Sequence, residues 1–174
     1  KGSAGRLLRA LGMYDFSRVK VQADHFTGEE FLEFQAKAQL GDAAAQSKLG
    51  FCYYKGVIVT EDLAEAVKWI RKSAEQGHPP AQRNLGDCYD NGKGVGMDPV
   101  EATKWWRKAA EQNDAAAQFN LAVRYEYGRG VQKDYVEAMN WYRKAAEQGD
   151  AVAQVRLGDG YATGQGVEKD PVQA

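Results

Sequence analysis

Among the 174 residues of this chain, a glycine-rich stretch is the first feature whose residue types and spacing could support chemistry. GKGVGMD, residues 92–98, could hold a phosphate on its backbone N–H groups. A phosphate loop follows a strand, however, and a P-loop also places Lys-Ser or Lys-Thr after its last glycine. Here helical patterns lie on both sides, and a similar stretch, GRGVQKD, recurs at residues 128–134. The recurrence favours a structural turn.

Two carboxylates could form an acid/base pair. Asp87 and Asp90 lie three residues apart in a helical pattern, a spacing that brings two side chains to one face. Arg83 shares that face, and it would compensate the charge of the pair. We therefore interpret these residues as a polar patch that contacts a peptide, not as a catalytic site.

Cysteine and histidine are too few for a nucleophilic or metal centre. Cys52 and Cys88 occupy equivalent positions in successive helices, whose axes lie about 8–10 Å apart when packed. A disulfide requires Cα atoms closer than about 7 Å, so we expect two free, buried thiols. His25 and His78 are the only histidines, and His78 is expected to cap the helix that begins beside it. The sequence thus predicts no catalytic residue, no metal and no cofactor.

Composition limits the partners and the compartment. Hydrophobic residues make up 44% and charged residues 27%, as in folded rather than disordered chains. The net charge of −1 gives no electrostatic reason to expect nucleic acid or an anionic membrane as a partner. No apolar run approaches the roughly 18 residues of a membrane-spanning helix, so no membrane insertion is expected. Unpaired cysteines slightly favour the cytoplasm over a periplasmic or secreted location.

The elements that position these residues follow from an internal repeat of 36 residues. Glutamines, leucines, tyrosines, aspartates and tryptophans recur in register without insertion or deletion: Gln46, Gln82, Gln118 and Gln154; Leu49, Leu85, Leu121 and Leu157; Tyr53, Tyr89, Tyr125 and Tyr161; Asp62, Asp98, Asp134 and Asp170; Trp69, Trp105 and Trp141. Such a period is the signature of a tandem array, in which each unit buries its apolar face against the next.

Each unit contains two predicted helices. The first runs from about Ala45 to Lys55 and ends at Gly56, the residue type that most readily adopts the left-handed conformation. The second begins after an aspartate that caps it, with a glutamate three residues later that is expected to reach back and complete a capping box: DLAE, DPVE and DYVE. It ends at Gly77, Asn113 or Gly149. Arg71, Arg107 and Arg143 each precede a glutamate by four residues, Glu75, Glu111 and Glu147, and we expect them to form ion pairs.

These residues resemble the Sel1-like repeat family. Its pattern is A-x-x-Q-x-x-L-G-x-x-Y, then G-x-G-V-x-x-D, then A-x-x-W-x-x-K-A-A-E-Q-G, and residues 115–149 match it almost throughout. The resemblance implies an all-α, right-handed superhelical solenoid of helix-turn-helix units, similar to tetratricopeptide repeats. Ile58, Ala122 and Asn113 depart from glycines of the pattern. Cysteine-rich bacterial members carry a disulfide in each repeat and are linked to penicillin binding. This chain has no second cysteine in any unit, so that activity is not carried over.

The register divides the chain into a non-repeat extension at 1–27, a degenerate capping helix at 28–44, repeats at 45–80, 81–116 and 117–152, and a partial repeat at 153–174 that we interpret as truncated. Within the extension, SRVKVQA (residues 17–23) could be a short strand, an ordered extension or a flexible linker.

If packing fixes the repeated positions, partner choice resides in the positions that vary. By analogy with tetratricopeptide arrays, the first helices would line a concave face. Its candidate contact residues are Phe51, Tyr54, Lys55, Arg83, Asp87, Asp90, Asn91, Phe119, Val123, Glu126 and Tyr127. Phe51 and Phe119 could alternatively pack against the adjacent second helix or the N-terminal segment. We expect a non-enzymatic scaffold that binds a protein or peptide, or alternatively a regulatory arm of a larger protein. The oligomeric state is left open.

Overall fold

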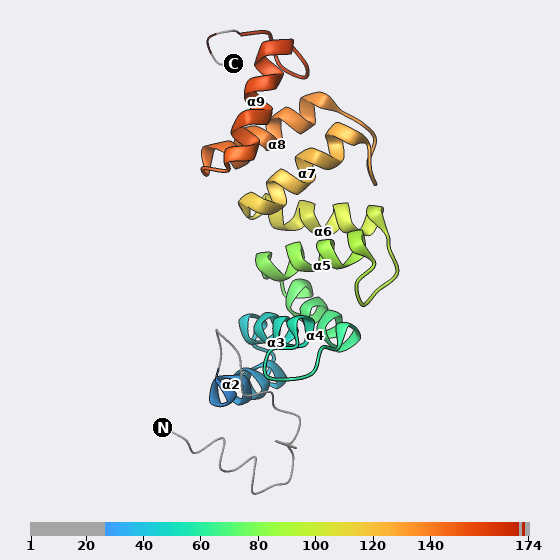
Figure 1. Ribbon diagram of the computed structural model, residues 1–174, viewed down its shortest axis with the longest axis vertical. Coiled ribbons are helices and arrows are strands. Elements are labelled where there is room, and N and C mark those ends of the chain that lie inside the picture. Colours follow the sequence, from blue (N-terminus) through green and yellow to red (C-terminus); the bar gives the residue numbers. More distant parts are fainter. Residues whose placement is uncertain (1–26, 171, 173–174) are drawn as a thin grey trace, which may run out of the picture.

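The computed structural model describes residues 27–170 and 172, and this part of the chain is a helical solenoid without strands. Its eight helices are α2 (Gly28–Gln39), α3 (Ala43–Lys55), α4 (Leu63–Glu75), α5 (Pro79–Asn91), α6 (Pro99–Glu111), α7 (Ala115–Tyr127), α8 (Tyr135–Glu147) and α9 (Ala151–Thr163). They stack in chain order along the long axis of the molecule (Figure 1). The predicted all-α fold is confirmed, whereas the possible strand at 17–23 lies outside the described residues.

Every helix packs mainly on its neighbours in the sequence. The first helices α3, α5 and α7 contact the second helices α4, α6 and α8 of their own units, and α4, α6 and α8 then contact the next first helix. Each second helix is therefore covered on two sides, which is how a pair too small to enclose a core buries its apolar residues.

Aspartates cap the second helix of each unit. Asp62, Asp98 and Asp134 accept hydrogen bonds from backbone N–H groups at the start of the second helices, as predicted. The capping boxes predicted for these helices are wrong, because the N–H group of each aspartate donates instead to the carbonyl of a tyrosine in the preceding helix, Tyr53, Tyr89 or Tyr125. Glu65 and Glu101 bond to lysines three residues later. A complete box occurs at Thr27 and Glu30, where α2 begins.

The glycines of the connectors permit a close backbone approach between units. Gly94, Gly130 and Gly166 have φ near 70°, and a Cβ on any of them would overlap a backbone carbonyl of the preceding second helix, that of Leu63, Pro99 or Tyr135. The stretch GKGVGMD is therefore a turn, as predicted. Ile58 occupies the corresponding position of the first unit with φ of 69° and is buried in the same cluster as Phe31. The first unit faces the shorter α2, and there the position is filled by an aliphatic side chain.

A buried glutamine in each of the first helices α3, α5 and α7 joins three successive helices. The Gln82 side chain in α5 donates from Nε2 to the Ala74 carbonyl of α4 at 3.1 Å, and its Oε1 accepts from Gln112 at the end of α6 at 2.7 Å. Gln46 and Gln118 make the same two bonds in their own units. These bonds satisfy buried polar groups and fix the register of the stack.

The arginines of the second helices contact aromatic rings instead of glutamates. Within the described residues none pairs with the glutamate four positions on, so that prediction is wrong. The guanidinium groups of Arg71 and Arg107 stack on the rings of Tyr89 and Tyr125, while lysines at the next position lie 4.0–4.3 Å from the rings of Trp69, Trp105 and Trp141. A cation over an aromatic ring is attracted to the face of the ring, whereas an ion pair between exposed side chains contributes little to the free energy of unfolding.

Small residues mark the closest helix contacts. A Cβ on Gly50 would lie 2.6 Å from Cγ1 of Ile70, and one on Gly86 would lie 2.6 Å from Nε1 of Trp106. Trp105 and Trp141 are buried as expected, whereas Trp69 is only half-buried. Asn113 stands in place of a capping glycine with φ of 70°, and its Oδ1 accepts hydrogen bonds from Gln118 and Gln148.

Replacing Gly94 with alanine should destabilise the protein by at least about 1 kcal/mol, because the left-handed backbone disfavours a Cβ and that Cβ would overlap the Leu63 carbonyl. The matched control is Gly96→Ala in the same connector, where a Cβ meets no atom within 4 Å and φ is not positive. It should leave the free energy of unfolding nearly unchanged. Urea denaturation measures both, and equal effects of the two variants would contradict the close approach.

Replacing Gln82 with methionine should cost about 1–3 kcal/mol, because the two hydrogen bonds that link α5 to the Ala74 carbonyl and to the Gln112 amide are lost. Gln154 occupies the same position of the last unit but is exposed, and among the described residues its amide bonds only to the Ala146 carbonyl. Gln154→Met should therefore cost much less in the same denaturation experiment. A comparable loss in both variants would show that burial does not set the strength of the bridge.

Candidate functional site

The predicted contact residues lie on one series of helices, the first helices α3, α5 and α7, and their outward-facing side chains are called here the first-helix surface. Phe51 is 37% exposed and Tyr127 is 55% exposed. Lys55 and Asn91 are exposed as well, and the remaining predicted residues are half-buried: Tyr54, Arg83, Asp87, Asp90, Phe119, Val123 and Glu126.

The structure brings four of these residues together around one pocket. Phe51, Tyr54 and Lys55 of α3 face Asp87 of α5 across a cavity of about 160 Å³. Three further residues complete its lining, namely Ile70, Asn84 and Cys88. Sequence reasoning missed these three as site residues. A signal was present for Asn84, which stands in register with Lys48, Asn120 and Arg156 and so varies from unit to unit.

Two ammonium groups lie near the ring of Tyr54. Lys55 Nζ is 5.6 Å and Lys93 Nζ 5.3 Å from the ring centroid, and Lys93 also donates a 3.0 Å hydrogen bond to the tyrosine hydroxyl. Within the described residues neither lysine has a carboxylate at ion-pair distance. One side of the pocket is therefore positively charged.

Asp87 and Asp90 are each held by a separate donor. Asp87 Oδ1 accepts from Trp106 Nε1 at 3.0 Å and from Asn120 at 3.4 Å. Burial raises the pKa of the Asp87 carboxyl above its usual range, and the hydrogen bond from Trp106 only partly offsets this effect. Asp90 forms a 2.5 Å ion pair with Arg124, whose guanidinium stacks on the Trp106 ring.

Two other predicted residues are tied into the packing of α7 and α8. The Phe119 ring is tilted against the Tyr142 ring at a centroid distance of 5.7 Å, which is the alternative placement considered for it. The Tyr142 hydroxyl donates to Glu126 at 2.5 Å, and burial together with this bond raises the pKa of Tyr142. Arg83 lies 3.8 Å from Asp114, the aspartate that caps α7. Phe51 and Tyr127 are therefore the large apolar side chains of the predicted set that remain exposed.

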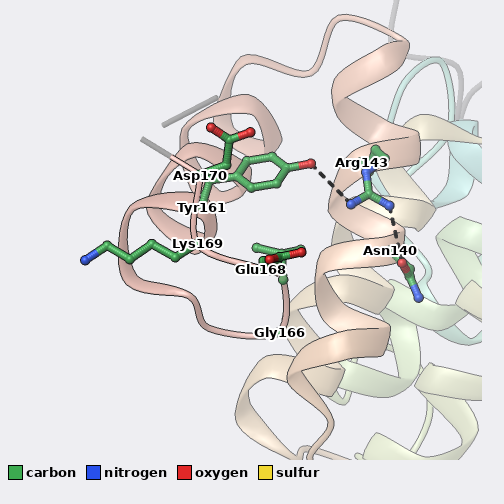
Figure 2. A pocket seen from close by; sticks show the side chains of 8 residues that line it. Asn140, Arg143, Tyr161, Gly166, Glu168, Lys169 and Asp170 are labelled. Carbon is green, nitrogen blue, oxygen red and sulfur yellow. Dashed lines mark hydrogen bonds between the residues drawn. The ribbon is translucent and has the colours of Figure 1, made fainter. Parts of the chain in front are cut away.

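A second kind of hollow recurs with the repeat. Arg143 of α8 donates to the Tyr161 hydroxyl of α9, and the connector residues 166–170 close the hollow beside them (Figure 2). Arg107, Tyr125 and residues 131–134 line its counterpart one unit earlier. Both hollows are lined by repeated positions, which indicates a by-product of stacking and not a site specific to this protein.

Groups suited to chemistry do not converge in the described residues. No cluster of three or more His, Cys, Asp or Glu side chains in them could hold a metal ion. Cys52 and Cys88 are free and buried. His78 stands at the N-cap position of α5, but its side chain makes no capping bond there, so the expected capping role is wrong. None of the described helices is long and apolar enough to cross a membrane.

The family model described as Sel1 repeat matches residues 43–78, 79–114, 115–150 and 151–174, which is most of the chain. The chain belongs to the Sel1 repeat family. Sel1 repeat proteins are generally protein-interaction scaffolds, and the repeat is typically non-enzymatic.

Solved Sel1 structures show the same fold. Similarity to c5321, a protective antigen present in uropathogenic Escherichia coli strains, extends over 82% of this chain and 31% of that one, with 43% identity and a TM-score of 0.79. A Sel1 repeat protein from Oxalobacter formigenes is 39% identical, with 83% of this chain and 65% of that one covered and a TM-score of 0.75. Cysteine-rich protein B of Helicobacter pylori is 25% identical, with 75% and 98% covered and a TM-score of 0.59.

A curated relative, a sel1-like repeat-containing protein of Acanthamoeba polyphaga mimivirus, is 46% identical over 39 residues, 22% of this chain and 7% of that protein. The chain thus spans less than two thirds of this viral protein and of the first two solved structures.

Replacing Asp87 with asparagine should stabilise the Sel1 array at neutral pH. A carboxyl whose pKa is higher in the folded than in the unfolded chain makes stability fall as pH rises from the unfolded pKa through the folded one. Asparagine keeps an oxygen that can accept from Trp106 and removes the charge. The gain in the free energy of unfolding should therefore be present at pH 7 and shrink as the pH falls toward 3.8, the ordinary aspartate value. A gain that is independent of pH would contradict the effect of burial.

Proposed function

We propose that this chain is a non-enzymatic scaffold that holds an extended peptide, or a segment of another protein, on the first-helix surface. The observation that carries the proposal is the pocket between α3 and α5, which has an exposed aromatic side chain, Phe51, at its edge. The framework does not require an exposed phenylalanine there, since the equivalent positions hold Asp87, Val123 and Asp159.

The distribution of exposed apolar groups supports the same surface. Tyr127 on α7 is exposed two units after Lys55, so aromatic contacts occur at two places along the stack. Aromatic residues tend to dominate binding energy at interfaces because they bury much apolar area at a small entropic cost. A segment running along the first helices could contact both residues at once.

Polar groups along the surface provide specificity. Asp87 and Asp90 are already oriented by Trp106 and Arg124, so binding would require little reorganisation of these side chains. The non-enzymatic part of the proposal is supported by the separate partners of these two carboxylates, which do not share a proton or a substrate position.

The proposal is tested with random peptides displayed on phage and selected on the immobilised chain. For a selected peptide, the double variant Phe51→Ala/Tyr127→Ala should weaken binding by about tenfold or more, because two exposed aromatic contacts are lost. Fluorescence anisotropy measures the dissociation constants.

The matched control is Val100→Ala/Val136→Ala, which removes two exposed apolar side chains from the second helices α6 and α8. It should leave the affinity unchanged. If the control weakens binding and the aromatic variant does not, peptides bind elsewhere and the assignment of the surface is wrong.

A further inference from the structure

The pocket between α3 and α5 exists because two positions of the repeat carry small side chains at this step of the stack. Ile70 stands where the next units have Trp106 and Tyr142, and Cys88 stands where the next unit has Arg124. One step further along, the Trp106 ring and the Arg124 guanidinium lie against each other at 4.7 Å and occupy the corresponding space. The space that is open between α3 and α5 is therefore filled by side chains at the next step of the stack.

The size of the cavity selects the kind of occupant. Its volume is about 160 Å³, whereas pockets for cofactors and other small molecules typically measure about 300–1,000 Å³. A single side chain of leucine or methionine size is the occupant that this space can enclose.

The floor of the cavity is uncharged. Ile70 and Cys88 are buried beneath it, and burial raises the pKa of the Cys88 thiol to about 11, so the thiol is protonated at neutral pH. Phe51 and the ring of Tyr54 form apolar walls. An apolar side chain placed here would leave water without losing any hydrogen bond.

The rim of the cavity is charged asymmetrically. Lys55 and Lys93 lie beside Tyr54 and have no carboxylate partner in the described part of the chain. On the opposite side, Asp87 Oδ1 is engaged by Trp106 and Asn120, and among the described residues no donor bonds to Oδ2. The lysines can receive a carboxylate of a ligand, and Asp87 Oδ2 can accept a peptide N–H group.

We propose that this pocket binds one leucine or methionine side chain of a bound peptide whose neighbouring residue is acidic. The inference rests on the proposed function, since it names the peptide chemistry that the first-helix surface recognises. The aliphatic side chain fills the cavity, the acidic residue lies against Lys55 and Lys93, and the backbone N–H group of the peptide faces Asp87. A basic segment would meet the ammonium groups of Lys55 and Lys93 beside Tyr54 and is disfavoured.

The test is the sequence preference of random peptides selected on phage with the wild-type chain. Enrichment of leucine or methionine beside Asp or Glu is the expected result. For a synthetic peptide with this motif, replacing the aliphatic residue with alanine should weaken binding roughly ten- to hundredfold. Enrichment of basic residues beside the aliphatic one, or of no motif, would overturn the inference.

Two double variants of the chain test whether Lys55 and Lys93 set the preference for an acidic residue in the peptide. The double variant Lys55→Glu/Lys93→Glu should weaken binding of the same peptide by about tenfold. In a new selection, the residue beside the aliphatic one should change from acidic to basic. The matched control Lys72→Glu/Lys144→Glu also reverses two exposed lysines that lie over aromatic rings, but on the second helices, and should change neither affinity nor preference.

Ile70→Phe should fill the cavity from its floor, as the larger Trp106 and Tyr142 do in the next units, and Gly50 beneath it leaves room for the ring. This variant should abolish the preference for leucine or methionine, and thermal denaturation confirms that it is folded. Should it unfold, Asn84→Phe fills the cavity from the rim on a half-buried position and gives the same readout.

The outcomes separate the two proposals. If selected peptides lose affinity with Phe51→Ala/Tyr127→Ala but show no acidic and aliphatic preference, the first-helix surface binds peptides and the pocket inference is wrong. If neither the aromatic nor the lysine variants change binding, or no peptide is selected, both proposals are wrong.

Discussion

The buried glutamine bridge that α3, α5 and α7 each make to the helices beside them is the interaction on which the solenoid depends. A single helical pair cannot enclose its own apolar face, so every pair must be held at a fixed distance and register against the next. Gln46, Gln82 and Gln118 provide this register, because each bonds to the helix before it and to the helix after it. The connector glycines set the distance, since their hydrogens face backbone carbonyls of the preceding unit.

A framework held in this way leaves other positions free to vary. The side chain at the position of Ile70, Trp106 and Tyr142 packs over Gly50, Gly86 or Ala122, and its size decides whether the space beside it is filled or open. The charged residues of the second helices, by contrast, recur at the same positions of each unit. Arginines and lysines there lie over aromatic rings that are close in space, and these contacts take the place of the expected ion pairs with glutamates.

The polar residues of the first-helix surface are mostly engaged within the protein. Asp90 pairs with Arg124, Glu126 accepts from Tyr142, and Asp87 accepts from Trp106. These bonds hold the carboxylates in place and distribute them along the stack, which suits the recognition of an extended segment better than acid/base catalysis. Lys55 and Lys93 differ, because both lie near the Tyr54 ring at the cavity and neither pairs with a carboxylate among the described residues.

The sequence by itself determined the helical repeat, the ends of most helices and the set of variable positions, because a 36-residue register places apolar, capping and glycine residues at fixed points of each helix. It did not determine which polar group would take the N–H of Asp62, Asp98 or Asp134, since the competing Tyr53, Tyr89 and Tyr125 carbonyls come close only after the helices pair. Nor could it show that Phe119 packs on Tyr142 whereas Phe51 borders a cavity. The two phenylalanines stand at different register positions, and the sequence predicted both as contact residues. Only the side chains that tertiary packing brings across from the second helix, Tyr142 in one case and Ile70 in the other, decide how much space remains.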